Sequence, residues 1–340
     1  MKILCLLLLG FSNVIFAKDL TINELNDCKL KIVGKLYYSE SAQAAVDNKA
    51  EKISNPDYVK NLEDIFENLP EIQKKVFCHV TRIQIHKELP SWGYANVIFD
   101  EDKRPIGSLI GIKVQAFSPN KNLDVFSWKE QLSFGLSKIK DPHFTINPAG
   151  PRVKLKIEKV KNPELFYMMV HEINHLVDFM NNVVRFRCTN SRLFGEGAYD
   201  CQFAPNSFSN LSYFNFFNAN SRGQLFLNFE EKTPLLSKFC FYECEEFMDI
   251  ADMESVYQDL AQTNFVSAYS MTTMYEDFAD FATVYLLHTL NLKYELKIYN
   301  ENNEVIYDQN KHFFDPLNQK MRIKRQWMQN FFTQNSLKYQ

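Results

Sequence analysis

One predicted helix limits what this chain can fold into more than any other segment does. Residues 163–181 read P-E-L-F-Y-M-M-V-H-E-I-N-H-L-V-D-F-M-N, so apolar side chains lie almost all round it. Such a helix runs through the interior of a protein. Asn162 suits the N-cap, Pro163 the first helical position, and Glu164 the positive end of the helix dipole. The sequence therefore predicts a central, buried helix.

This helix carries two histidines and a glutamate in the order of a metal site. His171 and His175 lie one turn apart on one face, about 6 Å along the axis, so both imidazoles can bind one zinc ion. Glu172 is rotated by about 100 degrees from His171. It can take a proton from a zinc-bound water as that water attacks a carbonyl. The pattern favours a zinc hydrolase, and the alternative is an ordinary buried helix with satisfied core histidines.

A third ligand must come from another segment, because the residues after His175 lack the third histidine of an extended H-E-x-x-H motif. We expect Glu276 to complete a His2Glu site with water in the fourth position. Asp280, one turn further along a helix predicted at residues 270–290, can accept a hydrogen bond from a ligand imidazole. Glu276 and Asp280 have apolar neighbours, which favours a role at a metal site, since buried acids need a partner. The alternatives are a solvated helix face or Glu196, between two glycines, as third ligand.

Two segments together resemble a known group of enzymes. H-E-x-x-H followed by a helix with E-x-x-x-D is the gluzincin pattern of zinc metallopeptidases. H-E-I-N-H-L-V-D with S-A-Y-S-M-T-T-M-Y-E-D-F-A-D resembles the anthrax lethal factor and Pro-Pro endopeptidase group, over residues 163–180 and 267–285. The resemblance implies an α+β fold, with a small sheet over a central H-E-x-x-H helix and a helical C-terminal lobe. It also implies a peptidase that uses one zinc ion.

The same resemblance assigns a role to each matching residue. It implies that His171, His175 and Glu276 are the metal ligands and that Glu172 is the general base. Tyr269, seven residues before Glu276, matches a tyrosine that stabilises the oxyanion or assists the leaving group.

The chain departs from the group's pattern in three respects. Asn174 stands where the group has glycine, and Asp280 stands where it has a second glutamate. The connection between the two segments is longer, and an insertion with four cysteines at about 185–262 would explain this. Asp178 shares a helix face with His175, and we expect either a supporting role beside the site or plain contact with solvent.

The first 17 residues, M-K-I-L-C-L-L-L-L-G-F-S-N-V-I-F-A, have the pattern of a secretory signal peptide. We therefore expect a secreted or periplasmic protein. No later stretch approaches the roughly 20 apolar residues of a spanning helix, so no membrane span is expected in the mature chain. The formal net charge is −3 and no basic stripe is present, which argues against a nucleic-acid partner. The expected partner is a peptide or protein substrate.

Six cysteines follow the signal peptide, and an even number in an exported chain suggests disulfides. Their spacing favours pairs between neighbours, Cys188 with Cys201 and Cys240 with Cys244. Cys28 and Cys78 are further candidates, whose partners the spacing does not assign. A cysteine metal site is disfavoured because the usual zinc spacings are missing.

The hydropathy pattern divides the chain into three parts. After the signal peptide at 1–17 we expect a mainly helical N-terminal region at 18–92, and then a metallopeptidase domain at 93–340. Loops with short helices are expected in its insertion. Strands are expected at 94–99, 106–117 and 153–158, and a helix closes the chain. The resemblance further implies that a sheet edge, formed by residues 94–115, lies above the metal helix and pairs with an extended peptide.

Two other functions fit the same residues. A zinc centre of this kind attacks any amide, so a cell-wall peptide amidase is the alternative enzyme. Outside enzymes, the alternative is an exported binding protein with a vestigial site. No G-x-S-x-G motif or phosphate-binding loop occurs, so serine hydrolases and nucleotide-binding proteins lack support.

Overall fold

The computed structural model describes residues 22–102, 104–118, 125–136, 147, 149–190, 198–219, 222–227, 235–239 and 247–338. These residues form an α+β protein with small sheets, as the sequence predicts. The α-helices are α1 (Ile22–Leu30), α2 (Pro56–Asn68), α3 (Glu71–Cys78), α4 (Val125–Leu132), α5 (Pro163–Asn181), α6 (Met253–Leu260), α7 (Met274–Thr289), α8 (Gln309–Phe314) and α9 (Gln319–Lys338).

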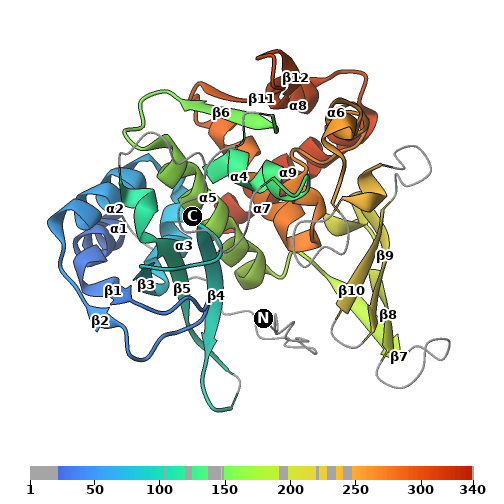
Figure 1. Ribbon diagram of the computed structural model, residues 1–340. Coiled ribbons are helices and arrows are strands. Elements are labelled where there is room, and N and C mark those ends of the chain that lie inside the picture. Colours follow the sequence, from blue (N-terminus) through green and yellow to red (C-terminus); the bar gives the residue numbers. More distant parts are fainter. Residues whose placement is uncertain are drawn as a thin grey trace.

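Three sheets surround the central helices α5 and α7. The first has the order β2-β1-β3-β5-β4, the second β10-β9-β8-β7 and the third β12-β11-β6. In Figure 1 the first sheet lies to the left and the second to the right, with α5 and α7 between them and the third sheet above. The strands are β1 (Leu36–Ser39), β2 (Glu51–Lys52), β3 (Val80–His86), β4 (Gly93–Phe99), β5 (Pro105–Lys113), β6 (Arg152–Ile157), β7 (Phe186–Asn190), β8 (Ala198–Phe203), β9 (Tyr213–Ala219), β10 (Arg222–Leu227), β11 (Tyr294–Tyr299) and β12 (Val305–Asp308).

The edge of the five-stranded sheet lies against α5. Strands β1, β3 and β5 are parallel, and β4 runs antiparallel to β5. Within the described chain β4 pairs with β5 alone, so it forms the edge of the sheet. Strands β4, β5 and β6 confirm the strands expected at 94–99, 106–117 and 153–158, although β5 ends at Lys113 and a short 3-10 turn follows it.

The N-terminal region is less helical than the sequence suggests. Strands β1 and β3 lie inside it and pair with each other and with β5. Helix α3 ends at Cys78 and β3 follows it, so the expectation of a mainly helical region is wrong from Val80 to His86. The residues V-T-R-I-Q-I-H include β-branched residues that suit a strand, most of them are buried, and they pair with β1 on one side and β5 on the other. Partners distant in sequence therefore decide the structure of this segment.

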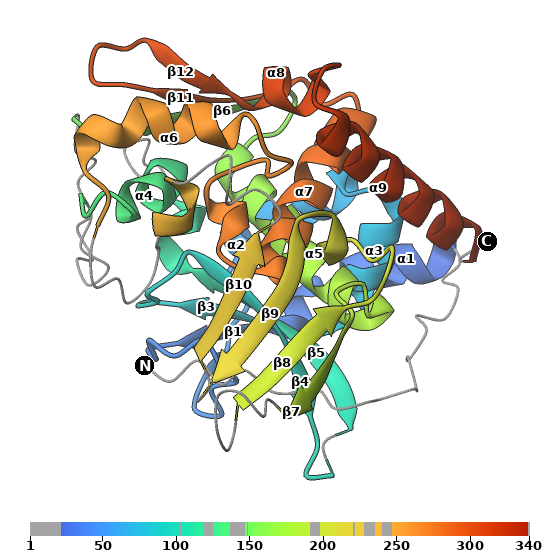
Figure 2. The ribbon, with the colours of Figure 1, turned by 90° about the vertical axis from the view of Figure 1, so that its right-hand side faces the viewer.

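The insertion at about 185–262 was expected to consist of loops with short helices, and this is wrong for its described part. Strands β7 to β10 form a four-stranded antiparallel sheet, which Figure 2 shows in front of the body of the protein. Helix α6 follows it. The strands are short and mix Phe with polar residues such as Asn and Gln, so their apolar alternation is weak and their pairing supplies most of the order.

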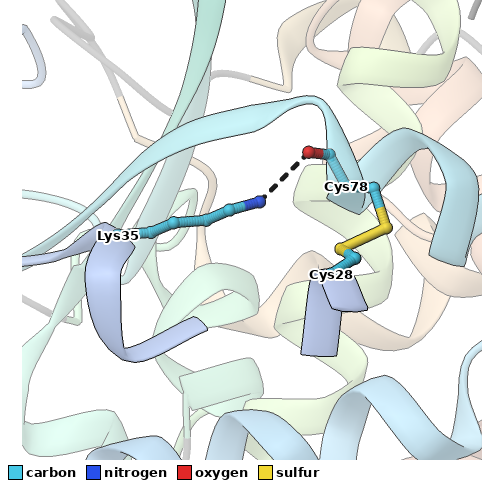
Figure 3. Close-up of a disulfide and its surroundings, with 3 residues drawn as sticks. All are labelled: Cys28, Lys35 and Cys78. Carbon is cyan, nitrogen blue, oxygen red and sulfur yellow. Dashed lines mark hydrogen bonds between the residues drawn. A yellow bond between two sulfur atoms is a disulfide. The ribbon is translucent and has the colours of Figure 1, made fainter. Parts of the chain in front are cut away.

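Two disulfides are present in the described residues. Cys188 and Cys201 face each other across β7 and β8, with 4.0 Å between their Cα atoms, which confirms the expected pair. Cys28 pairs with Cys78 and joins the end of α1 to the end of α3 (Figure 3). Nζ of Lys35 donates to the carbonyl oxygen of Cys78 at 3.1 Å beside this bond.

Some expectations concern parts of the chain outside the described residues. These are the signal peptide at residues 1–17, the pair Cys240 and Cys244, and the alternative ligand Glu196. In the part of the chain that the structure describes, no helix has the length and apolar character that crossing a membrane requires.

Candidate metal centre

Two capped helices supply the residues of the site. The side chain of Asn162 accepts a hydrogen bond from the backbone N–H of Leu165 at 3.2 Å, which confirms it as the N-cap of α5. Thr273 caps α7 and accepts from the backbone N–H of Glu276 at 3.1 Å. Helices α5 and α7 pack side by side in the centre of the molecule (Figure 1). The cap on α7 therefore fixes the turn that carries Glu276 against α5.

The structure brings His171, His175 and Glu276 together. The Nε2 atoms of the two histidines lie 3.1 Å apart. Oε2 of Glu276 lies 3.0 Å from Nε2 of His171 and 3.4 Å from Nε2 of His175. The histidines are 3% and 8% exposed, and the glutamate is partly exposed. These residues could hold a metal ion.

The spacing of these three atoms fits a tetrahedral metal site. Ligand atoms about 2.0 to 2.1 Å from a tetrahedral ion lie about 3.3 Å from one another. The three observed separations, from 3.0 to 3.4 Å, surround this value. The donor set of two imidazoles and one carboxylate therefore matches an ion of this size.

Asp280 fixes the orientation of the first histidine. Its Oδ1 lies 2.7 Å from Nδ1 of His171, and its Oδ2 accepts a hydrogen bond from Oγ of Ser267 at 2.5 Å. Although burial by itself opposes ionisation, the contact with His171 holds the pKa of Asp280 below its usual value. A carboxylate at Nδ1 leaves Nε2 of His171 facing the ligand cluster. Asp280 is 3% exposed, so the alternative of a solvated helix face is wrong for this residue.

The electric field of the site attracts positive charge. Burial and the neighbouring Lys129 oppose a charge on His171, but Asp280 and Glu276 outweigh both and raise the pKa of His171 to about 9. Burial likewise opposes a charge on Glu276, but the imidazoles of His175 and His171 hold its pKa well below the usual range. A cation bound at these atoms would take the place of the proton that this field favours.

Glu172 lies beside the cluster under the edge strand β4. It is buried, and burial raises its pKa although the two histidines act in the opposite direction. The strand approaches so closely that a Cβ at Gly93 would lie 2.9 Å from Oε1 of Glu172 and 3.1 Å from Sδ of Met168. Glycine at position 93 therefore makes room for the carboxylate.

Tyr269 lies at the margin of the cluster. It begins a 3-10 turn at Tyr269–Met271, and its ring centroid is 6.4 Å from that of His171. Its expected role toward an oxyanion stays a prediction.

Asp178 belongs to the end of helix α5. It is 2% exposed, so the expected alternative of plain solvent contact is wrong. Its Oδ1 accepts from the backbone N–H of Val184 at 2.8 Å, and burial raises its pKa to about 6. Asp178 thus ties the turn after α5 to the helix that carries both histidines.

Asn174, which departs from the group's pattern, joins three helices. Its Oδ1 accepts from Nε2 of Gln73 in α3 at 2.8 Å, and its Nδ2 donates to Oγ1 of Thr283 in α7 at 3.0 Å. All three residues are buried. Sequence reasoning did not find Gln73 or Thr283, because a polar residue in an apolar helix does not identify its partner. This hydrogen-bond network holds α3 and α7 to α5.

Lys129 of α4 is a third residue that the sequence did not point to. Its Nζ lies 3.8 Å from the centroid of the Tyr269 ring. A lone lysine in a short helix carries no signal from which this position could be found.

Comparisons with family models, with curated proteins and with solved structures give no match.

Proposed function

We propose that this protein is an exported, zinc-dependent metallopeptidase of gluzincin type, with Glu172 as its general base. The observation that supports the proposal most is the triangle formed by His171, His175 and Glu276, whose ligand atoms are 3.0 to 3.4 Å apart. The specific fold implied by the gluzincin pattern is part of the same proposal.

The choice of zinc rests on the donor set. Two neutral imidazoles and one carboxylate are the ligands of a catalytic His2Glu zinc site. The ion would supply a Lewis acid that makes water nucleophilic at neutral pH.

The chain's own residues divide the remaining work. Glu172 accepts the proton of the attacking water and delivers it to the leaving amine, and its burial keeps bulk water away from the carboxylate. Asp280 holds a proton on Nδ1 of His171, so that Nε2 can donate its lone pair. Tyr269 is proposed to donate a hydrogen bond to the carbonyl oxygen as charge develops on it.

The substrate would bind as an extended strand. Strand β4 is the edge of its sheet and passes directly over Glu172 at Gly93. An edge strand offers backbone N–H and C=O groups that an extended peptide can pair with. This arrangement would align a peptide bond with the carboxylate of Glu172.

Export is proposed from two features. The N-terminal residues have the pattern of a signal peptide, and the described chain contains two disulfides, which persist in oxidising compartments. The proposed location is therefore secreted or periplasmic.

Zinc content and hydrolysis, measured on the same purified samples, test the proposal. Wild-type protein should contain one zinc per chain by elemental analysis and should cleave casein or a peptide library. Glu172→Gln should keep its zinc and lose hydrolysis, whereas His175→Ala should lose zinc. Glu254→Gln, an exposed carboxylate on α6, is the control and should behave as wild type.

Other outcomes would overturn the proposal. Absence of zinc after reconstitution excludes a metal enzyme of this kind. Release of peptides from peptidoglycan without cleavage of casein would indicate a cell-wall amidase instead of a peptidase that acts on proteins. Zinc binding without hydrolysis of either substrate would indicate a binding protein.

A further inference from the structure

The ammonium of Lys129 lies near the candidate metal centre and forms no ion pair with any residue that the structure describes. Its side chain is partly buried, and Nζ lies 3.8 Å from the centroid of the Tyr269 ring. The Tyr269 ring in turn lies 6.4 Å from that of His171, centroid to centroid. In the chain that the structure describes, no carboxylate oxygen lies within 4.0 Å of this ammonium. The cation therefore contacts an aromatic face, and the carboxylates of Glu172, Asp280 and Glu130 act on its charge only from beyond ion-pair distance.

The nearby acids are already engaged with other groups. Asp280 contacts His171 and Ser267, and Glu276 contacts both imidazoles. The carboxylate of Glu130, the next residue along α4, accepts a hydrogen bond from the hydroxyl of Tyr257 in the core. Among the described residues, neither these carboxylates nor that of Glu172 lies within ion-pair distance of Lys129, so a carboxylate of a bound molecule can still contact its ammonium.

Helix α4 is held firmly enough to place a charge. Its Ser127 Oγ accepts from the backbone N–H of Val153 at 2.7 Å, and Nε2 of Gln131 donates to the carbonyl oxygens of Asn147 at 2.9 Å and Pro151 at 3.2 Å. These bonds hold the residues two positions before and two positions after Lys129 in place. A fixed cation loses less entropy on binding an anion than a mobile surface lysine does.

We propose that Lys129 binds a carboxylate of the substrate, so that the site prefers peptides with a negative charge close to the cleaved bond. The inference rests on the proposed peptidase function and adds the class of substrate to it. A partly desolvated ammonium without a partner is stabilised by an incoming carboxylate, and an uncharged peptide leaves it unpaired. The carboxylate belongs to an Asp or Glu side chain or to a free C-terminus, and the experiment distinguishes these sources.

Matched peptides measure the preference directly. One pair differs by a C-terminal carboxylate against a carboxamide, and a series compares Asp with Asn and Glu with Gln at each position flanking the cleaved bond. We expect zinc-loaded wild-type protein to cleave one acidic member with kcat/KM about 10- to 100-fold above its uncharged partner, the range typical of a hydrogen bond to a charged group. The arm that shows this ratio identifies the source of the carboxylate.

Variants of Lys129 assign the preference to this residue. In Lys129→Met the ratio should fall to about 1, and in Lys129→Glu it should reverse in favour of a peptide with Lys at the same position. Ratios within one variant are insensitive to losses of folded or zinc-loaded protein. Lys154→Met is the matched control, because Lys154 also lies over a tyrosine ring, that of Tyr299 at 4.5 Å, but in β6. Its ratio should equal that of wild type.

The outcomes separate this inference from the proposed function. Cleavage of acidic and uncharged peptides at equal rates by wild type, or an unchanged ratio in Lys129→Met, overturns the inference and leaves the peptidase proposal intact. Cleavage of no peptide overturns the peptidase proposal. Fluorescence anisotropy of the same labelled peptides then decides the role of Lys129, since equal affinity for the carboxylate and carboxamide forms overturns carboxylate binding.

Discussion

Replacing Gly93 with alanine should slow hydrolysis without removing the metal. The added Cβ would lie 2.9 Å from Oε1 of Glu172 and 3.1 Å from Sδ of Met168, whereas ordinary contacts begin at 3.4 Å. Both atoms belong to flexible side chains, so the carboxylate can give way by about 0.5 Å while strand β4 stays in place. A misplacement of about 1 Å costs about 100-fold in rate, so we expect kcat to fall about 10-fold.

Three measurements on Gly93→Ala separate this effect from misfolding. Stopped assays with a fluorogenic peptide give kcat, elemental analysis gives zinc content, and thermal unfolding gives Tm. We expect only kcat to change. Gly34→Ala is the control, because no atom lies within 4 Å of the Cβ added there. Full activity in Gly93→Ala would show that the close approach of β4 does not constrain Glu172.

Three further changes test other contacts. Asp280→Asn should weaken zinc binding about 10- to 100-fold in competition with a chelator, since the carboxylate that orients His171 is lost, and unchanged affinity would refute that role. Asn174→Gly should lower the free energy of unfolding by about 2 to 4 kcal/mol in urea, because two buried hydrogen bonds disappear. The control Asn61→Gly removes a half-buried residue of α2, whose side chain bonds only within its own helix, and should cost about 1 kcal/mol. Burial lowers the pKa of His312 to about 4, whereas its pKa in the unfolded chain is about 6.5. Between these two pH values only the unfolded chain binds the extra proton, so the stability of the protein falls as the pH falls. From pH 7 to pH 5 this loss should be about 2 kcal/mol, and it should be missing in His312→Gln; an equal loss in both proteins would contradict it.

The two helices of the candidate site could be predicted because their signals are local. Asn162 and Thr273 cap helices whose apolar spacing is visible within a single turn or two. The approach of Glu276 to the histidines was expected from the chemistry of a three-ligand site and from the resemblance. Its carboxylate oxygen indeed lies 3.0 Å from Nε2 of His171.

What the sequence did not predict depends on partners distant along the chain. Strand β3 continues directly from α3 without a glycine or proline between them, and only its neighbours β1 and β5 make it a strand. The four strands β7 to β10 likewise depend on one another. Lys129 reaches Tyr269 across 140 residues of sequence, and Gln73 reaches Asn174 across 101. Periodicity describes which face of a helix is buried, but it does not identify what that face meets.

The position of β3 in its sheet limits how the protein can mature. A zymogen whose leader ended near residue 90 would lose β1, β2 and β3 together on activation, and β5 would lose the parallel strand that pairs with it on the side away from β4. A single nick between Cys28 and Cys78 would release nothing, because the disulfide keeps both pieces joined. We therefore expect β1, β2 and β3 to stay in the mature protein, because the edge strand over Glu172 depends on them for its support.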